Sequence, residues 1–240
     1  MLFLFDRPFN IVQFVEAIVG WGLIIYWVVR RYKRQERKPV IWKMIVVAAV
    51  GLFSFSITLE LFGQTVKLAI LPLGVWIVFI FYRSRSWNVY RRFAWIGFIA
   101  NYIFLVITLL AGFIHHAIYD QDKAATFLAD VREAEVVGIH PSAKAVVFDP
   151  QRFDDLLGEL QHGDLSSNAD WYMQSKHEHE PYYQQERFPY ALLGAESSWG
   201  SGLQAAVYVR DDGKGLLIVA SDRTYYYLSE QPLIRLEVGA

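Results

Sequence analysis

Two histidines, His177 and His179, form the group in the sequence that is most suggestive of metal chemistry. Residues two apart on an extended strand point to the same face, so both imidazole rings could bind one divalent metal. Glu180, His162 or Asp164 would have to complete the ligand set. A solvated, charged loop is the favoured alternative, because two histidines are an incomplete set. If a metal binds, a structural role is favoured over a catalytic one.

Glu16 is the ionisable residue that most needs an explanation, since it lies inside a long apolar stretch. Such groups are costly in a membrane unless they are paired or face other helices. The residues predicted to share this intramembrane polar cluster are Glu16, Ser54, Thr58, Lys67, Asn101 and His115. One interpretation is an ion or proton site in a small transporter or channel component. Polar contact between helices is favoured instead, because four short spans without an inverted repeat are atypical of a transporter.

Other chemistry finds little support in the sequence. Ser197, Ser198 and Ser201 lie in GAESSWGSG, which lacks the GxSxG spacing of a hydrolase nucleophile. No P-loop, dinucleotide fingerprint or HExxH pattern occurs, and the chain has no cysteine. We therefore predict a protein that is not an enzyme and uses no cofactor.

The composition divides the chain into two halves. Hydrophobic residues make up 54% of the 240 residues, and the long apolar runs stop near His116. Residues 1–116 hold 13 basic and 4 acidic residues, whereas residues 117–240 hold 10 basic and 20 acidic ones. We predict a transmembrane domain over 1–116 and a soluble domain over 117–240. A soluble domain with this excess of acidic residues is a poor candidate for binding nucleic acid.

Four apolar segments have the length of about 17 to 25 residues that a membrane span needs. We expect an all-α membrane domain of four transmembrane helices, over Ile11 to Val29, Val40 to Thr58, Val66 to Tyr82 and Phe93 to His115. Lys43 and Pro72 make the second and third spans the weakest of the four. The first span is interpreted as a retained helix, because no cleavage pattern follows it.

The loops indicate an orientation. Basic residues concentrate between the first and second spans, in RRYKRQERK, and between the third and fourth, in RSRSWNVYRR. Bases mark cytoplasmic loops, and tryptophan and tyrosine residues cluster at the same ends. We predict a multi-pass protein of the cell membrane with both its N-terminus and its C-terminus extracytoplasmic.

The second half predicts a small α+β domain with an antiparallel β-meander. Helices are expected over Asp120 to Glu135 and after the N-cap pair Asp149-Pro150. Short strands are expected over Val136 to Ile139 and Ala145 to Phe148, with the segment from Gln161 to Ser201 mostly loop. The meander should comprise Leu203 to Val209, Gly215 to Ala220, Thr224 to Leu228 and Leu233 to Val238.

Three functions are compatible with this organisation. The favoured one is an extracytoplasmic domain for binding, sensing or envelope interaction, held by a membrane anchor. Its expected partners are the lipid bilayer and an envelope protein, and the sequence leaves its oligomeric state open. The alternatives are the transporter or channel component that uses Glu16, and a metal-dependent surface hydrolase that uses His177 and His179.

Overall fold

The structure is a computed structural model, and it describes residues 9–62, 64–82, 86–166, 186–221 and 223–236. The chain forms two compact units. We call Ile11–Ala117 the apolar unit. We call Ile118–Ala240, together with the segment that ends at Asn10, the C-terminal domain. The segment before the first helix thus belongs to the same unit as the second half of the chain.

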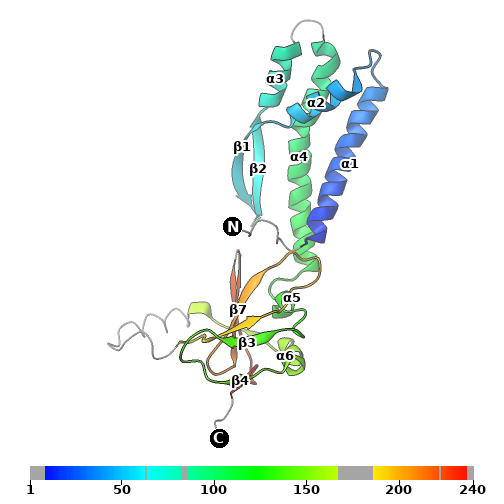
Figure 1. Ribbon diagram of the computed structural model, residues 1–240. Helices are drawn as coiled ribbons and strands as arrows, with labels where there is room; N and C mark the ends of the chain where they lie inside the picture. The colour runs from blue at the N-terminus through cyan, green and yellow to red at the C-terminus, as the bar shows by residue number, and fades with distance from the viewer. Residues whose placement is uncertain (1–8, 63, 83–85, 167–185, 222, 237–240) are drawn as a thin grey trace, which may run out of the picture. The chain divides into compact units, whose positions relative to one another are not determined.

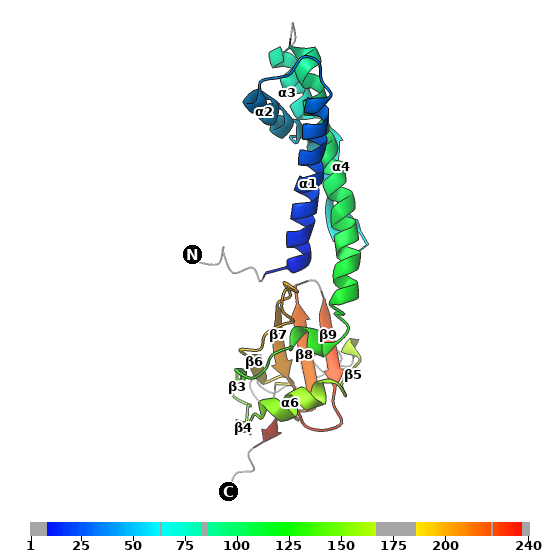
Figure 2. The same cartoon turned by 90° about the vertical axis from the view of Figure 1, so that its right-hand side faces the viewer.

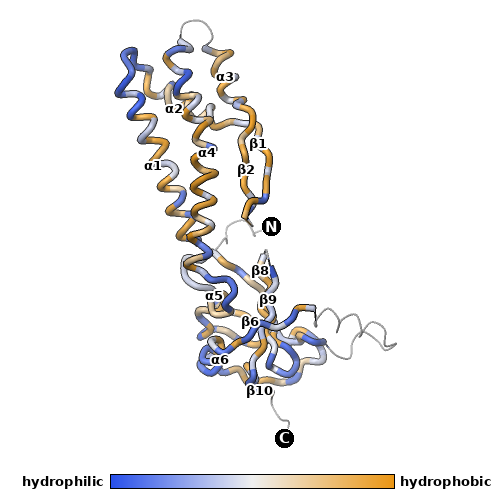
Figure 3. Tube along the Cα trace, turned by 180° about the vertical axis from the view of Figure 1, so that it is seen from behind, coloured by the Kyte–Doolittle hydropathy of each residue, from blue (hydrophilic) through white to orange (hydrophobic). Residues whose placement is uncertain are grey.

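Two long helices, α1 (Ile11–Lys33) and α4 (Trp87–Ile118), dominate the apolar unit (Figure 1). At 1.5 Å per residue they are about 34 Å and about 48 Å long. Both are long and apolar enough to cross a membrane. They lie side by side, and the Trp21 ring of α1 meets the Phe104 ring of α4 edge to face at 5.5 Å. Figure 3 shows the hydrophobic residues that extend along both helices.

The second and third predicted spans are not continuous helices, so the prediction of four transmembrane helices was wrong in this part. The chain from Val40 to Tyr82 forms two short helices, α2 (Ile41–Gly51) and α3 (Leu73–Tyr82). Between them lies a hairpin of strands β1 (Phe55–Leu61) and β2 (Gln64–Leu71). Neither short helix has the length of a span.

Local sequence explains this hairpin. Polar and apolar residues alternate from Ser54 to Leu61, which is the period of a strand. Leu61 pairs with Gln64, and Phe62 between them has a φ of 53°, as a two-residue hairpin turn requires. Pro72 follows β2 directly, and the residue before a proline is driven out of helical conformation. A helix can therefore begin no earlier than Pro72, and α3 begins at Leu73.

Glycines let the short helices approach their neighbours closely. A Cβ atom at Gly51 of α2 would clash with the backbone of Ala94 in α4, and one at Gly97 of α4 would clash with Ala48. A Cβ atom at Gly74 of α3 would clash with the Val50 carbonyl. Close backbone approach at small residues is typical of helix packing in membranes. The core beneath these contacts includes the fully buried Phe93.

The C-terminal domain is built on a six-stranded antiparallel sheet. Its spatial order is β3 (Glu135–Gly138), β6 (Tyr190–Leu193), β7 (Ala205–Val209), β8 (Gly215–Ala220), β9 (Thr224–Leu228) and β5 (Gln161–His162). The four central strands, β6 to β9, follow one another in a meander. Figure 2 shows this sheet with α5 (Ala124–Phe127) and α6 (Pro150–Leu157) on one face.

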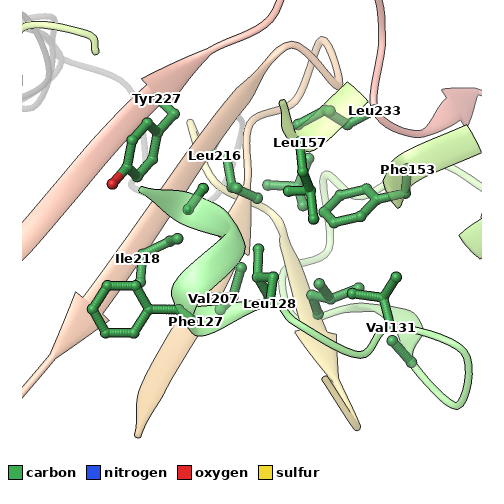
Figure 4. Close-up of a cluster of buried hydrophobic side chains, with 14 of the residues drawn as sticks. Phe127, Leu128, Val131, Phe153, Leu157, Val207, Leu216, Ile218, Tyr227 and Leu233 are labelled. Carbon is green, nitrogen blue, oxygen red and sulfur yellow. The ribbon is translucent and has the colours of Figure 1, made fainter. Parts of the chain in front are cut away.

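The core of the domain lies between these helices and the sheet (Figure 4). Alternate residues of the central strands point into it, as the period of a strand requires. Val207, Leu216 and Ile218 from the sheet meet Phe127 of α5 and Phe153 of α6. Asp149 caps α6 by accepting hydrogen bonds from the backbone N–H groups of Gln151 and Arg152. The predicted helix start at this position is confirmed.

Two local predictions for this domain were wrong. The helix expected over Asp120 to Glu135 is only one turn, α5, and Leu128 and Val131 beyond it are buried in loop conformation. The last segment expected in the meander forms β10 (Arg235–Leu236), which pairs with β4 (Val146–Val147) in a separate two-stranded sheet. The strands expected on either side of residues 140–144 are present as β3 and β4, and β3 pairs with β6.

Candidate functional site

The C-terminal domain carries a groove of about 350 Å³ along the connection from β6 to β7. Residues 195–205 form most of its wall, and Phe9 and Phe127 complete it. Gly194, Gly200 and Gly202 have positive φ values of 76°, 73° and 67°. Glycine adopts this conformation without steric cost, so the segment can turn sharply three times.

Hydrogen bonds from serine hydroxyls hold this connection in place. Ser197 donates through its hydroxyl to the Leu203 carbonyl at 2.8 Å, and the Ser201 hydroxyl accepts from the Leu203 backbone N–H at 3.2 Å. The Ser198 backbone N–H donates to the Thr126 carbonyl at 2.9 Å. Ser197 and Ser201 thus act as loop hydroxyls.

Aromatic side chains stand at the mouth of the groove. Trp199 is 78% exposed and Phe9 is 53% exposed, and their rings lie 6.2 Å apart. The Tyr119 hydroxyl donates to the Trp199 carbonyl at 3.0 Å. Asn10 forms a β-bridge with Ser201, so the chain that leads into α1 is attached to the groove. No local pattern in the sequence indicates this exposure of Trp199.

A short backbone ladder supports the other side of the groove. Asp130 and Glu196 donate to each other's carbonyls through their backbone N–H groups, at 3.1 and 2.8 Å. The side-chain hydrogen bonds from Arg132 to Asp130 lower the pKa of that carboxyl to about 2. Asp130 is therefore negatively charged at neutral pH.

The lining of the groove is suited to binding and provides no catalytic pair. Its walls combine apolar surface from Phe9, Phe127 and Leu203 with serine, glutamine and backbone groups. Glu196 is the one ionisable side chain among the residues that line it. Apolar walls with a few polar groups are the usual composition of a ligand site.

The predicted intramembrane residues are engaged at several separate places. The Glu16 carboxylate of α1 accepts a hydrogen bond from the Thr108 hydroxyl of α4, a partner that the sequence did not indicate. Asn101 donates to the carbonyls of Leu52 at 3.2 Å and Phe98 at 3.0 Å. Asn101 thus connects α4 to the end of α2 at Leu52. The contact between Glu16 and Thr108 connects the two long helices.

The remaining members of that predicted cluster lie on other elements. The Ser54 and Ser56 hydroxyls are 3.1 Å apart at the start of β1. Thr58 faces Lys67 across the hairpin, and both residues are exposed. His115 lies near the end of α4, with its ring 6.2 Å from that of His116. The described contacts do not join these residues to Glu16, and an ion site at Glu16 stays a prediction.

The predicted metal ligands His177, His179 and Glu180 lie outside the described residues. Within the described ranges, no three histidine, aspartate or glutamate side chains gather in a way that could hold a metal ion. His162, one of the residues considered as a further ligand, packs its ring against that of Tyr227, with the ring centroids 4.9 Å apart and the planes tilted by 38°. Metal binding by the histidine pair stays a prediction.

Comparison with known proteins adds no assignment. No protein family, no curated protein and no solved structure matches this chain.

Proposed function

We propose that the chain is a multi-pass membrane protein that presents its C-terminal domain outside the cytoplasm, where the domain binds a component of the cell envelope. One observation carries the membrane part. In their most apolar 18-residue windows, only 11% of the residues of α1 and 22% of those of α4 are buried by the rest of the chain. The core helix of a soluble protein would be mostly buried, so lipid is the solvent that fits this surface.

Charge supports the proposed orientation. Arg30, Arg31 and Lys33 lie in the last turn of α1, and Arg91 and Arg92 lie in the second turn of α4. Since α1 and α4 run in opposite directions through the bilayer, both basic ends belong to the same side. The positive-inside rule makes that side cytoplasmic. Both the N-terminus and the C-terminal domain then lie outside.

The groove supports a binding role for the domain. Trp199 exposes 78% of its surface beside the exposed Phe9, although the domain has a well-filled core elsewhere. Exposed aromatic residues beside a concave surface are characteristic of interaction sites. The partner proposed is an envelope protein that inserts an apolar side chain into the groove.

A photocrosslinking experiment tests this role. A benzophenone amino acid replaces Trp199 in the full chain, and cells that produce the protein are irradiated. The control carries the same group at Asp155, an exposed position on α6. We expect a discrete crosslinked protein product from position 199 that is absent from position 155. Equal products from both positions, or adducts with lipid only, would contradict the binding role.

A further inference from the structure

A second cavity, within the apolar unit, has different chemistry from the groove. It has a volume of about 740 Å³ and lies between the end of α1 and the start of α4. Five arginines line it, namely Arg30, Arg31, Arg34, Arg91 and Arg92. They come from two segments that lie about sixty residues apart in the chain, so the fold gathers them. We call this cavity the arginine pocket.

Specific contacts fix the two walls of the arginine pocket. Gln35 donates through Nε2 to the Val89 carbonyl at 2.9 Å, which ties the turn after α1 to the first turn of α4. The Tyr90 hydroxyl accepts from the Val40 backbone N–H at 3.3 Å. Arg30 donates to the Tyr26 hydroxyl at 3.4 Å. The pocket is therefore preorganised by protein contacts.

Within the described part of the chain, no carboxylate neutralises the charge of the pocket. All the ion pairs that the described residues form lie in the C-terminal domain, so none of the five arginines pairs with a described carboxylate. The Nε atom of Arg31 is buried and has no hydrogen-bond partner among the described residues. Arg30, Arg34, Arg91 and Arg92 are exposed, and Arg31 is half-buried. Like charges that lie together repel one another, and a bound anion relieves this repulsion. An anion that accepts several hydrogen bonds therefore suits this wall.

The chemistry of the wall fits a phosphate group. All five cations are arginines, although Lys33 at the end of α1 and Lys38 in the loop that follows are close to them in the sequence. The planar guanidinium fork matches the geometry of phosphate oxygens and binds them in pairs, which a lysine ammonium group does not.

The remainder of the pocket is apolar. Trp27, Trp95, Ile96 and Ile99 line it further along the two helices. Trp27 and Trp95 are each 43% exposed. Tryptophan is enriched at the depth of lipid head groups. A charged end followed by an apolar wall thus matches a molecule with a phosphate head and hydrocarbon chains.

We propose that the arginine pocket binds the phosphate of an anionic phospholipid, with the acyl chains lying along Trp95, Ile96 and Ile99. Basic pockets between transmembrane helices on the cytoplasmic side hold such head groups. This inference goes beyond the proposed function, because the site is in the apolar unit and requires no partner of the C-terminal domain. The arginines that orient the protein also bind lipid in this proposal.

Native mass spectrometry of the full chain in mild detergent tests the proposal. The ligands are phosphatidylglycerol, cardiolipin, phosphatidylcholine and inorganic phosphate, titrated separately. We expect the two anionic lipids to bind at least about tenfold more tightly than phosphatidylcholine, since a hydrogen bond between charged groups corresponds to about a tenfold change in Kd. Inorganic phosphate should bind more weakly than either anionic lipid, because it makes no contact with the apolar wall.

Matched variants distinguish lipid binding in the arginine pocket from binding to a basic surface in general. Arg31→Gln with Arg92→Gln removes one guanidinium from each wall. Arg37→Gln with Lys38→Gln removes the same charge from exposed residues that do not line the pocket. We expect the first pair alone to bring anionic lipid binding down to the level of phosphatidylcholine. Equal loss from both pairs, no loss from the first pair, or inorganic phosphate binding as tightly as lipid would overturn the proposal.

Discussion

Asp130 and Arg132 form a small electrostatic unit beside the groove. Arg132 donates from Nε to both carboxylate oxygens of Asp130, at 3.0 and 3.1 Å, and its own backbone N–H also donates to that carboxylate. These bonds stabilise the ionised carboxyl and lower its pKa from 3.8 to about 2. Because the folded-state pKa is the lower one, the interaction stabilises the fold above pH 3.8 and is lost as pH falls towards 2.

We predict that Asp130→Asn lowers the denaturant midpoint of the C-terminal domain at pH 7 by a small amount that shrinks as the pH falls from 4 to 2. The pair is exposed, so added salt should reduce the effect. The midpoint is measured by tryptophan fluorescence of the full chain in micelles. Asp154→Asn, on the exposed surface of α6, is the control. A difference between wild type and Asp130→Asn that grows towards pH 2 would contradict the sign of the shift.

At the residue scale, the sequence predicted features whose cause is local. The Asp149 cap depends on the next three residues, and the pattern Asp-Pro before an amphipathic segment identified it. The hydroxyl partner of Glu16 is 92 positions away in the chain, so no local pattern could identify Thr108. The exposure of Trp199 likewise depends on how residues 194–205 fold back on Phe9 and Phe127.

At the scale of secondary-structure elements, the hairpin of β1 and β2 shows that the order of residues carries information that mean hydropathy lacks. Mean hydropathy treats the segments from Val40 to Thr58 and from Val66 to Tyr82 as spans, because it ignores the order of residues. The alternation Ser-Phe-Ser-Ile-Thr-Leu-Glu-Leu over residues 54–61 has a period of two, which favours a strand. Pro72 then limits the helix on its far side. The two spans without such alternation, α1 and α4, have the length and composition of membrane spans.

The contact between α1 and α4 can be tested by a double-mutant cycle. If Glu16 provides polar packing, Glu16→Leu should cost roughly 1 kcal/mol or less, and its coupling to Thr108→Val should be about 0.6 kcal/mol, the scale of hydrogen bonds between membrane helices. Glu16→Gln should be well tolerated, since the amide keeps an acceptor and removes a costly charge. Unfolding in mixed micelles measures each variant.

Thr65→Val provides the control for this cycle, because Thr65 is exposed on the hairpin and pairs with Glu60. We expect no coupling between it and Glu16. If Glu16→Gln left the fold intact but abolished a pH-dependent activity, the packing interpretation would fail and an ion site would take its place.

The side of the membrane on which the C-terminal domain lies depends on whether the number of crossings is even. Four predicted spans and the two candidate spans α1 and α4 both return the chain to the side where it began. With two spans, the basic ends of α1 and α4 still lie on the same side of the membrane. The positive-inside rule therefore predicts the same orientation as with four spans. Composition changes near His116, and the sequence predicts a division of the chain there. It does not predict that Asn10 belongs to the same unit as the second half of the chain, because this depends on the pairing of Asn10 with Ser201.

The most direct test of the proposed topology is the accessibility of single cysteines in intact cells. The chain has no native cysteine, so Glu36→Cys and Asp155→Cys each introduce a unique thiol at an exposed position. A membrane-impermeant maleimide is applied before and after permeabilisation. We predict that position 155 is labelled in intact cells and that position 36 is labelled only after permeabilisation. Labelling of position 36 but not 155 in intact cells would contradict an extracytoplasmic C-terminal domain.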